Sequence, residues 1–291
     1  MSTLSICIPS RNEIFLKRTI EDVLEKATGD IEIFPILDGY DIPEEEVVHD
    51  KRVHYIHFKT GLGKRQGINA MVAVCKGEYV MSLDAHCMMS KGFDEQLVKD
   101  HQPNWVQVPR RNRLDAENWC IQEQSDDRPP IDYEYIMFPG KFEPRSLHGF
   151  KWDAKSRERA DVLLDETMGM QSSCWFMTKK WFKERGFMDY KYQAWGQENE
   201  EITLETYKNG GKLITNKNCC YHHLHKGKKY GRMYFLSQDM TRKSYAYAYQ
   251  KWVIEEKEFF IKFINKFMPI PGWPENWEEI LYKEKQHEKR Q

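Results

Sequence analysis

The sequence predicts an α/β fold: a mostly parallel sheet with helices on both faces, followed by a helical, aromatic-rich C-terminal extension. Two observations predict the sheet. Short apolar runs alternate with helix-spaced apolar residues over residues 4–100, in the order strand, helix, strand, strand, helix, strand. Polar groups and glycines follow the apolar runs, as at the carboxyl ends of parallel strands. The 291 residues, 40% of them hydrophobic, suffice for one large α/β domain or two modest ones.

Each element of the first part has its own signal. Strands are expected where apolar runs end at polar or glycine residues, and helices where apolar residues recur every three or four positions. The expected strands are 4–8, 31–37, 53–58 and 79–83, and the expected helices are 15–24 and 68–74.

The remainder is less regular. Residues 103–160 are expected to contain a strand at 105–108, then a basic run and a long excursion over one side of the sheet. Beyond it, the sequence predicts a short helix starting at Trp181, a helix that ends at Gly210-Gly211, a strand at 212–215 and helical residues from 234 to 267.

Asp84 and His86 follow the strand at 79–83 and lie two positions apart. Period two points both side chains to the same side of an extended chain. A carboxylate and an imidazole at a strand end make half a site for a divalent metal, and the pair suits Mn or Zn better than Ca or Mg, which prefer oxygen ligands alone. On this pair alone, a turn-capping Asp84 and a locally packed His86 explain the residues equally well.

Other strand ends carry groups that suit a nucleotide. Asp38, after the second strand, could accept hydrogen bonds from a base or ribose, and Lys64 or Arg65 could meet a phosphate beside a Gly-rich segment. That segment, GLGKRQG, lacks the P-loop pattern. Each residue alone is more readily an ordinary turn residue, so their recurrence at successive strand ends carries the prediction.

Charge and cysteine content limit the functional classes. Lys and Arg number 44 against 45 Asp and Glu, so any affinity for nucleic acid must come from a local patch. Seven cysteines, an odd number, fit buried free thiols in a reducing compartment. With no secretory pattern at the N-terminus and no apolar run of spanning length, we expect a cytoplasmic protein without a membrane span.

Taken together, the motifs resemble the GT-A (Rossmann-like) fold glycosyltransferases of the family-2 type, and most of all the catalytic domain of the polypeptide N-acetylgalactosaminyltransferases. Four segments carry the resemblance to that family: IPSRNE, LDGYD, the run GLGKRQGINAMVAVCKGEYVMSLDAHC with its D-x-H motif, and WGQENEEITLETYKNGG, which is similar to the family's W-G-G-E-N segment. They cover about residues 4–100 and 165–232. The stretch TMGMQSSCWFM lacks that family's Gly-Gly, and we expect no anchor or lectin-like domain, so acceptor identity is not carried over.

The resemblance implies a UDP-sugar donor, a Mn²⁺ (or Mg²⁺) cofactor and a set of site residues. The implied third metal ligand beside Asp84 and His86 is His223, with His222 and His225 as rivals. Implied donor-binding residues are Pro9, Arg11, Glu13, Asp38, Lys64, Arg65, Asp84, Trp195, Lys226 and Lys228, and implied catalytic residues are Glu198 and Asn199.

The implied stereochemistry is open. Inverting relatives place an Asp base directly after the Glu of this motif, where this sequence has Asn199. An amide cannot take the proton. Either Glu198 or Glu200 substitutes, or the reaction retains configuration without a protein base, which we favour. A helix-start charge explains Glu198 equally well.

A basic loop, 225–232, follows the histidines, and Arg110, Arg111 and Arg113 form a second basic cluster. The loop is expected either as a lid over the diphosphate or as a solvated surface. Together the clusters could form a cationic rim that binds a phosphate-bearing polymeric acceptor. As the acceptor we therefore favour a hydroxylated base in DNA, as in some phages, slightly over a glycan, lipid or protein hydroxyl. A sugar-phosphate nucleotidyltransferase and a non-catalytic nucleotide- or glycan-binding protein are the alternatives.

The expected domain organisation has two parts. Residues 1–232 form the GT-A domain, with a nucleotide-sugar half at about 1–102 and an acceptor half at about 103–232. Residues 233–291 form the helical extension packed on it.

Overall fold

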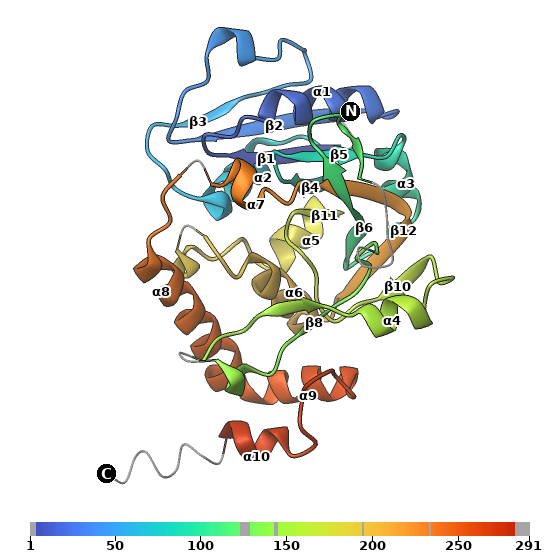
Figure 1. The fold of residues 1–291 in the computed structure, drawn as a ribbon, viewed down its shortest axis with the longest axis vertical. Coiled ribbons are helices and arrows are strands. Elements are labelled where there is room, and N and C mark those ends of the chain that lie inside the picture. The colour runs from blue at the N-terminus through green and yellow to red at the C-terminus, as the bar shows by residue number, and fades with distance from the viewer. Residues whose placement is uncertain (1–3, 123–128, 143–144, 194, 233, 283–291) are drawn as a thin grey trace.

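The computed structural model describes residues 4–122, 129–142, 145–193, 195–232 and 234–282, and is built around one ten-stranded sheet (Figure 1). Its main order is β3-β2-β1-β4-β11-β6-β12-β10, with β5 paired to β12 and β7 to β6. The strands are β1 (Leu4–Ser10), β2 (Ile31–Asp38), β3 (Ile56–Phe58), β4 (Tyr79–Leu83), β5 (Cys87–Met89), β6 (Trp105–Asp115), β7 (Cys120–Ile121), β10 (Leu164–Glu166), β11 (Cys174–Thr178) and β12 (Lys212–His223), and β8 (Glu134–Ile136) pairs with β9 (Gly149–Lys151) in a separate hairpin.

Helices connect and cover these strands. The α-helices are α1 (Leu16–Lys26), α2 (Lys64–Val74), α3 (Phe93–Lys99), α4 (Asp153–Glu158), α5 (Lys179–Glu184), α6 (Glu198–Lys208), α7 (Gly227–Tyr230), α8 (Gln238–Tyr249), α9 (Lys257–Phe267) and α10 (Trp277–Tyr282). A π-helical segment, Gln250–Glu255, joins α8 to α9. None of the described helices has the length and apolar character needed to cross a membrane.

The sheet is mostly parallel in strand direction. β1 pairs in parallel with β2 and β4, β2 pairs in parallel with β3, and β12 pairs in parallel with β6. β11 is antiparallel to both β4 and β6, so those two run the same way, and six strands of the main path share one direction. The predicted sheet is confirmed, and the carboxyl ends of β1, β2 and β4 lie along one edge.

The two faces of the sheet carry separate apolar cores because side chains alternate along each strand. On β1, Leu4, Ile6 and Ile8 pack with α1 and α3, whereas Cys7 belongs to the opposite core. That second core joins residues of α2, α5 and α6 to β4 and β11. Helices therefore cover both faces, as predicted.

Two strands are longer than the sequence indicated. We expected strands at 105–108 and 212–215, but β6 and β12 extend to Asp115 and His223 and pair along most of that length. The basic run Arg110–Arg113 and the histidine cluster thus lie in strands, and β6 is an interior strand of the sheet. Charged residues hid the pattern, since Arg110, Arg111 and Arg113 interrupt the apolar alternation by which strands are recognised.

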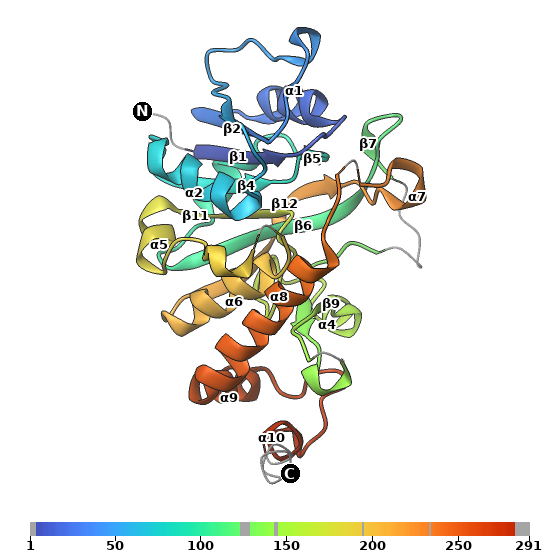
Figure 2. The ribbon, with the colours of Figure 1, turned by 90° about the vertical axis from the view of Figure 1, so that its left-hand side faces the viewer.

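The C-terminal helices pack on the lower part of the domain. Figure 2 shows α8 beside α6, with α9 and α10 farthest from β1–β4. Their core contains Trp252, Phe260 and Ile264 together with Leu204 of α6 and Tyr192. The Trp252 indole also donates a 2.6 Å hydrogen bond to the Tyr192 hydroxyl. The predicted aromatic-rich helical extension is confirmed for residues 234–282; residues 283–291 lie outside the described part of the chain.

Candidate active site

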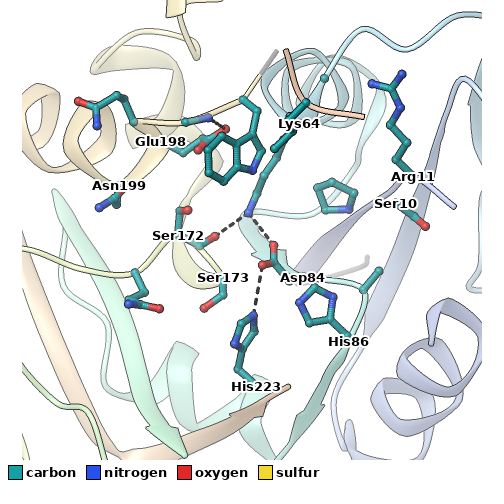
Figure 3. Close-up of a pocket in the computed structure, with 18 of the residues that line it drawn as sticks. Ser10, Arg11, Lys64, Asp84, His86, Ser172, Ser173, Glu198, Asn199 and His223 are labelled. Carbon is teal, nitrogen blue, oxygen red and sulfur yellow. Dashed lines mark hydrogen bonds and ion pairs between the residues drawn. The ribbon is translucent and has the colours of Figure 1, made fainter. Parts of the chain in front are cut away.

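A polar cleft of about 400 Å³ lies at the carboxyl ends of β1, β2 and β4, between the N-termini of α2 and α6 (Figure 3). Such a volume is typical of a small-ligand site. Sequence-predicted residues that line it are Pro9, Arg11, Glu13, Asp38, Lys64, Asp84, His86, Trp195, Glu198, Asn199, His223 and Lys226. The cleft therefore brings together residues from both halves of the predicted domain.

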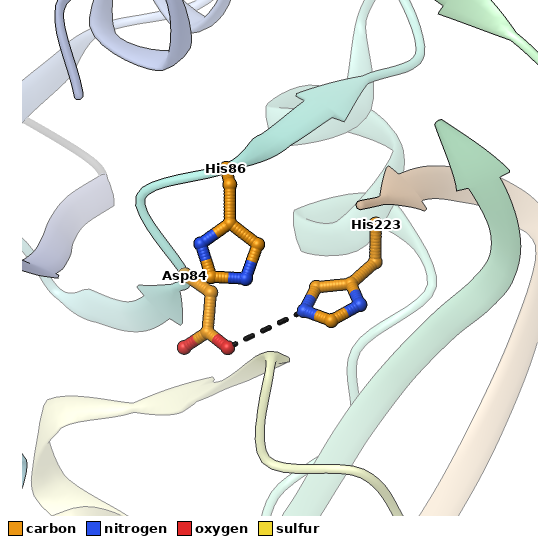
Figure 4. A group of neighbouring side chains, drawn as sticks. All are labelled: Asp84, His86 and His223. Carbon is orange, nitrogen blue, oxygen red and sulfur yellow. Dashed lines mark ion pairs between the residues drawn. The ribbon is translucent and has the colours of Figure 1, made fainter. Parts of the chain in front are cut away.

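Asp84, His86 and His223 converge at the centre of the cleft (Figure 4). Asp84 and His86 lie in the turn between β4 and β5, and His223 ends β12, which pairs with β5 directly opposite Cys87. One potential ligand atom from each residue lies within 4.8 Å of the others. Asp84 Oδ2 lies 3.5 Å from His223 Nε2.

The protonation states of these residues suit metal ligation. Burial would raise the pKa of Asp84, but Lys64 and the two histidines lower it well below its usual range. Burial lowers the pKa of His223 to about 3, although the contact with Asp84 acts in the opposite direction. The site thus offers a carboxylate and a neutral imidazole, the forms that bind metal.

The side chains also fit a cation geometrically. Both ring nitrogens of His223 are buried without a hydrogen-bond partner among the described residues. His86 Nδ1 lies 3.1 Å from Glu13 Oε2, a contact that fixes its ring as outer carboxylates do in metal sites. A carboxylate with two imidazoles is a donor set for Mn or Zn. Of the rivals, His222 is buried near Cys220, and His225 is exposed.

Lys64 and Asp38 shape the donor side of the cleft. The Lys64 ammonium donates to Asp84 Oδ1 at 2.6 Å and to the Ser172 carbonyl at 2.8 Å. Asp38 accepts the backbone N–H groups of Leu62 (2.6 Å) and Gly63 (3.1 Å), which fixes the loop before α2. Asp38 therefore organises the Gly-rich loop as well as lining the cleft.

Arg65 does not line the cleft, contrary to the expectation that Lys64 or Arg65 could meet a phosphate. It is 1% exposed on the covered side of α2. Its guanidinium donates to Glu201 Oε2 at 2.6 Å, to Glu198 Oε1 at 3.4 Å and to the Gly196 carbonyl at 2.6 Å. One residue turns a helix by about 100°, so neighbours on α2 point to different sides. Of the two alternatives, only Lys64 faces the cleft.

The WGQEN segment forms the opposite wall, at the start of α6. Glu198 is buried and accepts the Gly196 N–H at 3.2 Å besides its contact with Arg65. The Asn199 amide donates to Glu200 Oε1 at 2.8 Å. Trp195 lines the cleft and stacks under the Arg232 guanidinium, 4.5 Å from its ring centre.

The basic residues do not act as one rim. Lys226 lines the cleft and forms an ion pair with Glu13, but Lys228 is exposed outside it. Arg110 is paired with Asp132 at 2.8 Å, and Arg111 is buried. The structure therefore does not bring the two basic clusters together as one rim: Arg111 is buried, and Lys228 lies outside the residues that line the cleft.

Sequence reasoning missed part of the wall. Glu134, His148, Gln171, Tyr234 and Tyr245 also line the cleft. Glu134 and His148 come from the irregular middle of the chain, Gln171 from TMGMQSSCWFM, and Tyr234 and Tyr245 from the C-terminal extension, and no pattern singled them out as site residues. Only a fold that places β8 and β9 beside α6 brings these residues to the site.

Two buried carboxyls give the protein a pH-dependent stability. Burial raises the pKa of Glu134 to about 7 and of Glu200 to about 8, and the charges of Glu134 and Glu198 add to the second shift. The folded state then holds protons that the unfolded state releases above about pH 4.5. The free energy of unfolding should fall as pH rises from there to about pH 8. Urea titrations at about pH 5 and about pH 9 measure this fall. Between these two pH values, the double variant Glu134→Gln/Glu200→Gln should lose less free energy of unfolding than the parent. An equal loss, matching a Glu205→Gln control, would contradict the assignment.

Comparison with known proteins agrees with the geometry. A model of the glycosyl transferase family 2 matches residues 5–186, more than half of the chain. The chain belongs to this family. The match covers β1 to α5, including Asp84 and His86, and it confirms the expectation of a nucleotide-sugar-dependent glycosyltransferase at the level of the family.

Among curated family-2-like relatives, polypeptide N-acetylgalactosaminyltransferase 3 of Taeniopygia guttata is 26% identical over 282 residues, covering 90% of this chain and 44% of the relative. Polypeptide N-acetylgalactosaminyltransferase 4 of Mus musculus is 26% identical over 277 residues, with coverages of 89% and 45%. The chain thus spans about half the length of the curated relatives it matches, and the predicted likeness to their catalytic domain is confirmed.

Solved structures show the same fold. The structure of GalNAc-T7 with UDP, GalNAc and Mn²⁺ superposes with a TM-score of 0.66 at 20% identity, covering 98% of this chain and 55% of that one. S. aureus TarS 1-349 in complex with UDP-GlcNAc superposes with a TM-score of 0.56 at 11% identity, with coverages of 91% and 72%. The GT-A fold predicted from the sequence is therefore confirmed.

Proposed function

We propose that this family-2 protein transfers a sugar from a UDP-sugar to a hydroxyl acceptor, with Mn²⁺ (or Mg²⁺) as cofactor. The observation that carries the proposal is the convergence of Asp84, His86 and His223 in the cleft where nucleotides bind in open α/β sheets. UDP and Mn²⁺ in the GalNAc-T7 structure, and UDP-GlcNAc in the TarS structure, support the donor and the metal.

On the donor side, each residue has a distinct task. Asp84, His86 and His223 would hold the metal, which when bound supplies Lewis-acid stabilisation of the departing diphosphate. Lys64 adds a positive charge on the same side of the cleft, since its ammonium already contacts Asp84. Pro9, Arg11 and Asp38 line the part of the cleft next to β1 and β2, where we place the nucleoside.

On the opposite wall, Glu198 and Trp195 would contact the sugar or the acceptor. Glu198 is held by Arg65 and the Gly196 N–H, so its position is fixed before ligand binds. Lys226 pairs with Glu13 at the cleft entrance, and we propose that the segment 225–232 closes over the diphosphate. The donor half is then about residues 1–102, and the acceptor half about 103–232.

For the acceptor, we propose a hydroxylated base in a polymer such as modified DNA. A second groove of about 580 Å³ adjoins the cleft and shares Trp195, Leu236 and Tyr245 with it. Arg232 and Arg242 line this groove, and the nearby Phe235 side chain is 86% exposed. Cations interleaved with aromatic side chains suit a single-stranded phosphate backbone with stacked bases. A protein hydroxyl is the alternative that the relatives' names favour.

The groove yields a binding prediction. Arg232→Ala/Arg242→Ala should weaken binding of a single-stranded oligonucleotide that carries a hydroxymethylated pyrimidine, and should lower the slope of log affinity against log salt by about one per lost phosphate contact. Fluorescence anisotropy at several salt concentrations measures both quantities. Lys180→Ala/Lys183→Ala, on α5, is the charge-matched control. Equal affinity and slope in both variants would remove nucleic acid as the acceptor.

The activity itself is tested by incubating the protein with a panel of UDP-sugars and MnCl₂. We expect UDP release that a chelator abolishes, and mass spectrometry should find one added sugar on modified DNA but not on peptide or glycan. Sugar addition to peptide would favour the protein acceptor. Formation of pyrophosphate from sugar-phosphate turnover would instead identify a nucleotidyltransferase, and binding without turnover a non-catalytic protein.

A further inference from the structure

Two buried carboxyls meet at the acceptor side of the cleft. Glu134 of β8 and Glu200 of α6 are each 3% exposed and both line the cleft. They converge on Gly149, whose N–H donates to Glu200 Oε1 at 2.9 Å. A Cβ at Gly149 would lie 3.4 Å from Glu134 Oε2 and 3.7 Å from Glu200 Oε1, so the strand passes between the two carboxyls.

Each carboxyl keeps one oxygen that the described residues leave unsatisfied. Glu134 Oε1 and Glu200 Oε2 are buried and lack a hydrogen-bond partner there, as does Gln197 Oε1 nearby. A buried polar atom without a partner costs about 1–3 kcal/mol. Because both side chains line the cleft, a ligand that brings O–H or N–H donors is the natural partner for them.

The other carboxyls of the cleft are already engaged. Glu198 accepts from Arg65 and from the Gly196 N–H. Glu13 is occupied by His86 and Lys226, Asp84 by Lys64, and Asp38 by the N–H groups of Leu62 and Gly63. Asn199 carries an amide, which cannot act as a base, and this amide donates to Glu200 Oε1. Glu200 Oε2 is therefore the oxygen that remains available to a ligand.

Resting on the proposed function, we propose that Glu200 is the general base, taking the proton of the acceptor hydroxyl through Oε2, and that Glu134 positions it and tunes its basicity. In the reaction, the acceptor O–H bond breaks and its proton passes to Glu200. The acceptor oxygen forms a bond to C1 of the sugar, and the bond from C1 to the β-phosphate oxygen breaks, with its electron pair leaving on UDP. Because the hydroxyl attacks C1 directly as UDP leaves, the proposed step is a single displacement, so the product has inverted configuration. Inversion replaces the retention favoured from Asn199 alone.

The electrostatic surroundings support this role. The groups that face the pair are Arg111 of β6, Glu198 of α6, His148 before β9 and Tyr245 of α8. Burial and the charge of Glu134 raise the pKa of Glu200 to about 8, which lies near a working pH, as an effective base requires. Removing the Glu134 charge must lower that pKa.

The first test uses the full chain with a UDP-sugar, MnCl₂ and the hydroxymethylated oligonucleotide. Glu200→Gln should lower kcat by about 10²–10⁴-fold while calorimetric affinity for UDP with Mn²⁺ stays within about twofold of the parent. Glu200→Asp should recover part of the rate, and Glu205→Gln, an equal change on the same helix outside the cleft, should leave it unchanged. Glu134→Gln should shift the alkaline rise of the rate to lower pH, which a merely structural residue would not do.

The second test needs no variant. Proton NMR of the parent's product, or of the sugar released to water and read before it mutarotates, gives the anomeric configuration, and inversion is expected. Retention, or full activity of folded Glu200→Gln, overturns the assignment while leaving the glycosyltransferase proposal intact. No turnover of any UDP-sugar by the parent overturns the proposed function, and the base with it.

Discussion

Replacing Asp84 with asparagine is expected to lower UDP-sugar turnover by at least about 10²–10³-fold, the loss typical of removing one group that stabilises developing negative charge. The substitution removes the only carboxylate of the three-residue group that the structure assembles, and the full negative charge that its lowered pKa secures. Initial rates of UDP release at saturating donor, with and without MnCl₂, measure the effect.

Two further variants make the Asp84 result interpretable. Asp84→Asn also leaves the Lys64 ammonium without its carboxylate, so His223→Ala, which leaves the Lys64–Asp84 pair intact, should show the same loss of Mn²⁺-dependent UDP binding. Asp50→Asn, in a surface pair with Arg52, is the matched control and should keep full activity. Mn²⁺-dependent binding that survives in both cleft variants would show that the metal, if used, binds elsewhere.

The largest expected effect on stability belongs to Arg65→Leu. This variant leaves Glu198 and Glu201, both nearly inaccessible to solvent, without their shared cation. Breaking a buried ion pair by removing one partner costs about 3–5 kcal/mol, since the remaining charge is buried and uncompensated. Urea unfolding monitored by circular dichroism should show this loss in the free energy of unfolding.

The Arg65 variant also separates two roles. If Arg65 supports α6 from behind, activity should fall together with stability, because Glu198 loses its fixed position. Arg52→Leu, which breaks the surface pair with Asp50, should cost less than about 1 kcal/mol. If Arg65→Leu folds with parental stability and loses only its affinity for UDP, the structural role is wrong. Arg65 would then bind phosphate, as one of the two alternatives from the sequence had it.

The parts of the site that follow strand periodicity could be predicted. Asp84 and His86 stand two positions apart after an apolar strand, and their shared direction follows from extended geometry alone. Their partner could not be derived this way. His223 is 137 positions beyond His86 in the chain, so its place rested on the resemblance and on counting from Gly210-Gly211. The structure brings it opposite Cys87 because β12 is three times as long as the four-residue strand expected at 212–215, and the added residues pair with β5 and β6.

Other parts could not be predicted, for identifiable reasons. Lys64 and Arg65 are adjacent and chemically similar, and only the packing of α6 against α2 decides which faces the cleft. Glu134 lies on a three-residue strand within an irregular region, so no pattern marked it. Polar and charged positions in β6 and β12 likewise broke the apolar alternation by which strands are recognised.

The most direct test of the metal site is diffraction from crystals soaked with MnCl₂ and UDP, recorded near the manganese absorption edge. We predict one anomalous peak within coordinating distance of Asp84, His86 and His223, with the diphosphate of UDP on its open side. A peak elsewhere in the cleft, or ordered UDP with no peak among these three side chains, would contradict it.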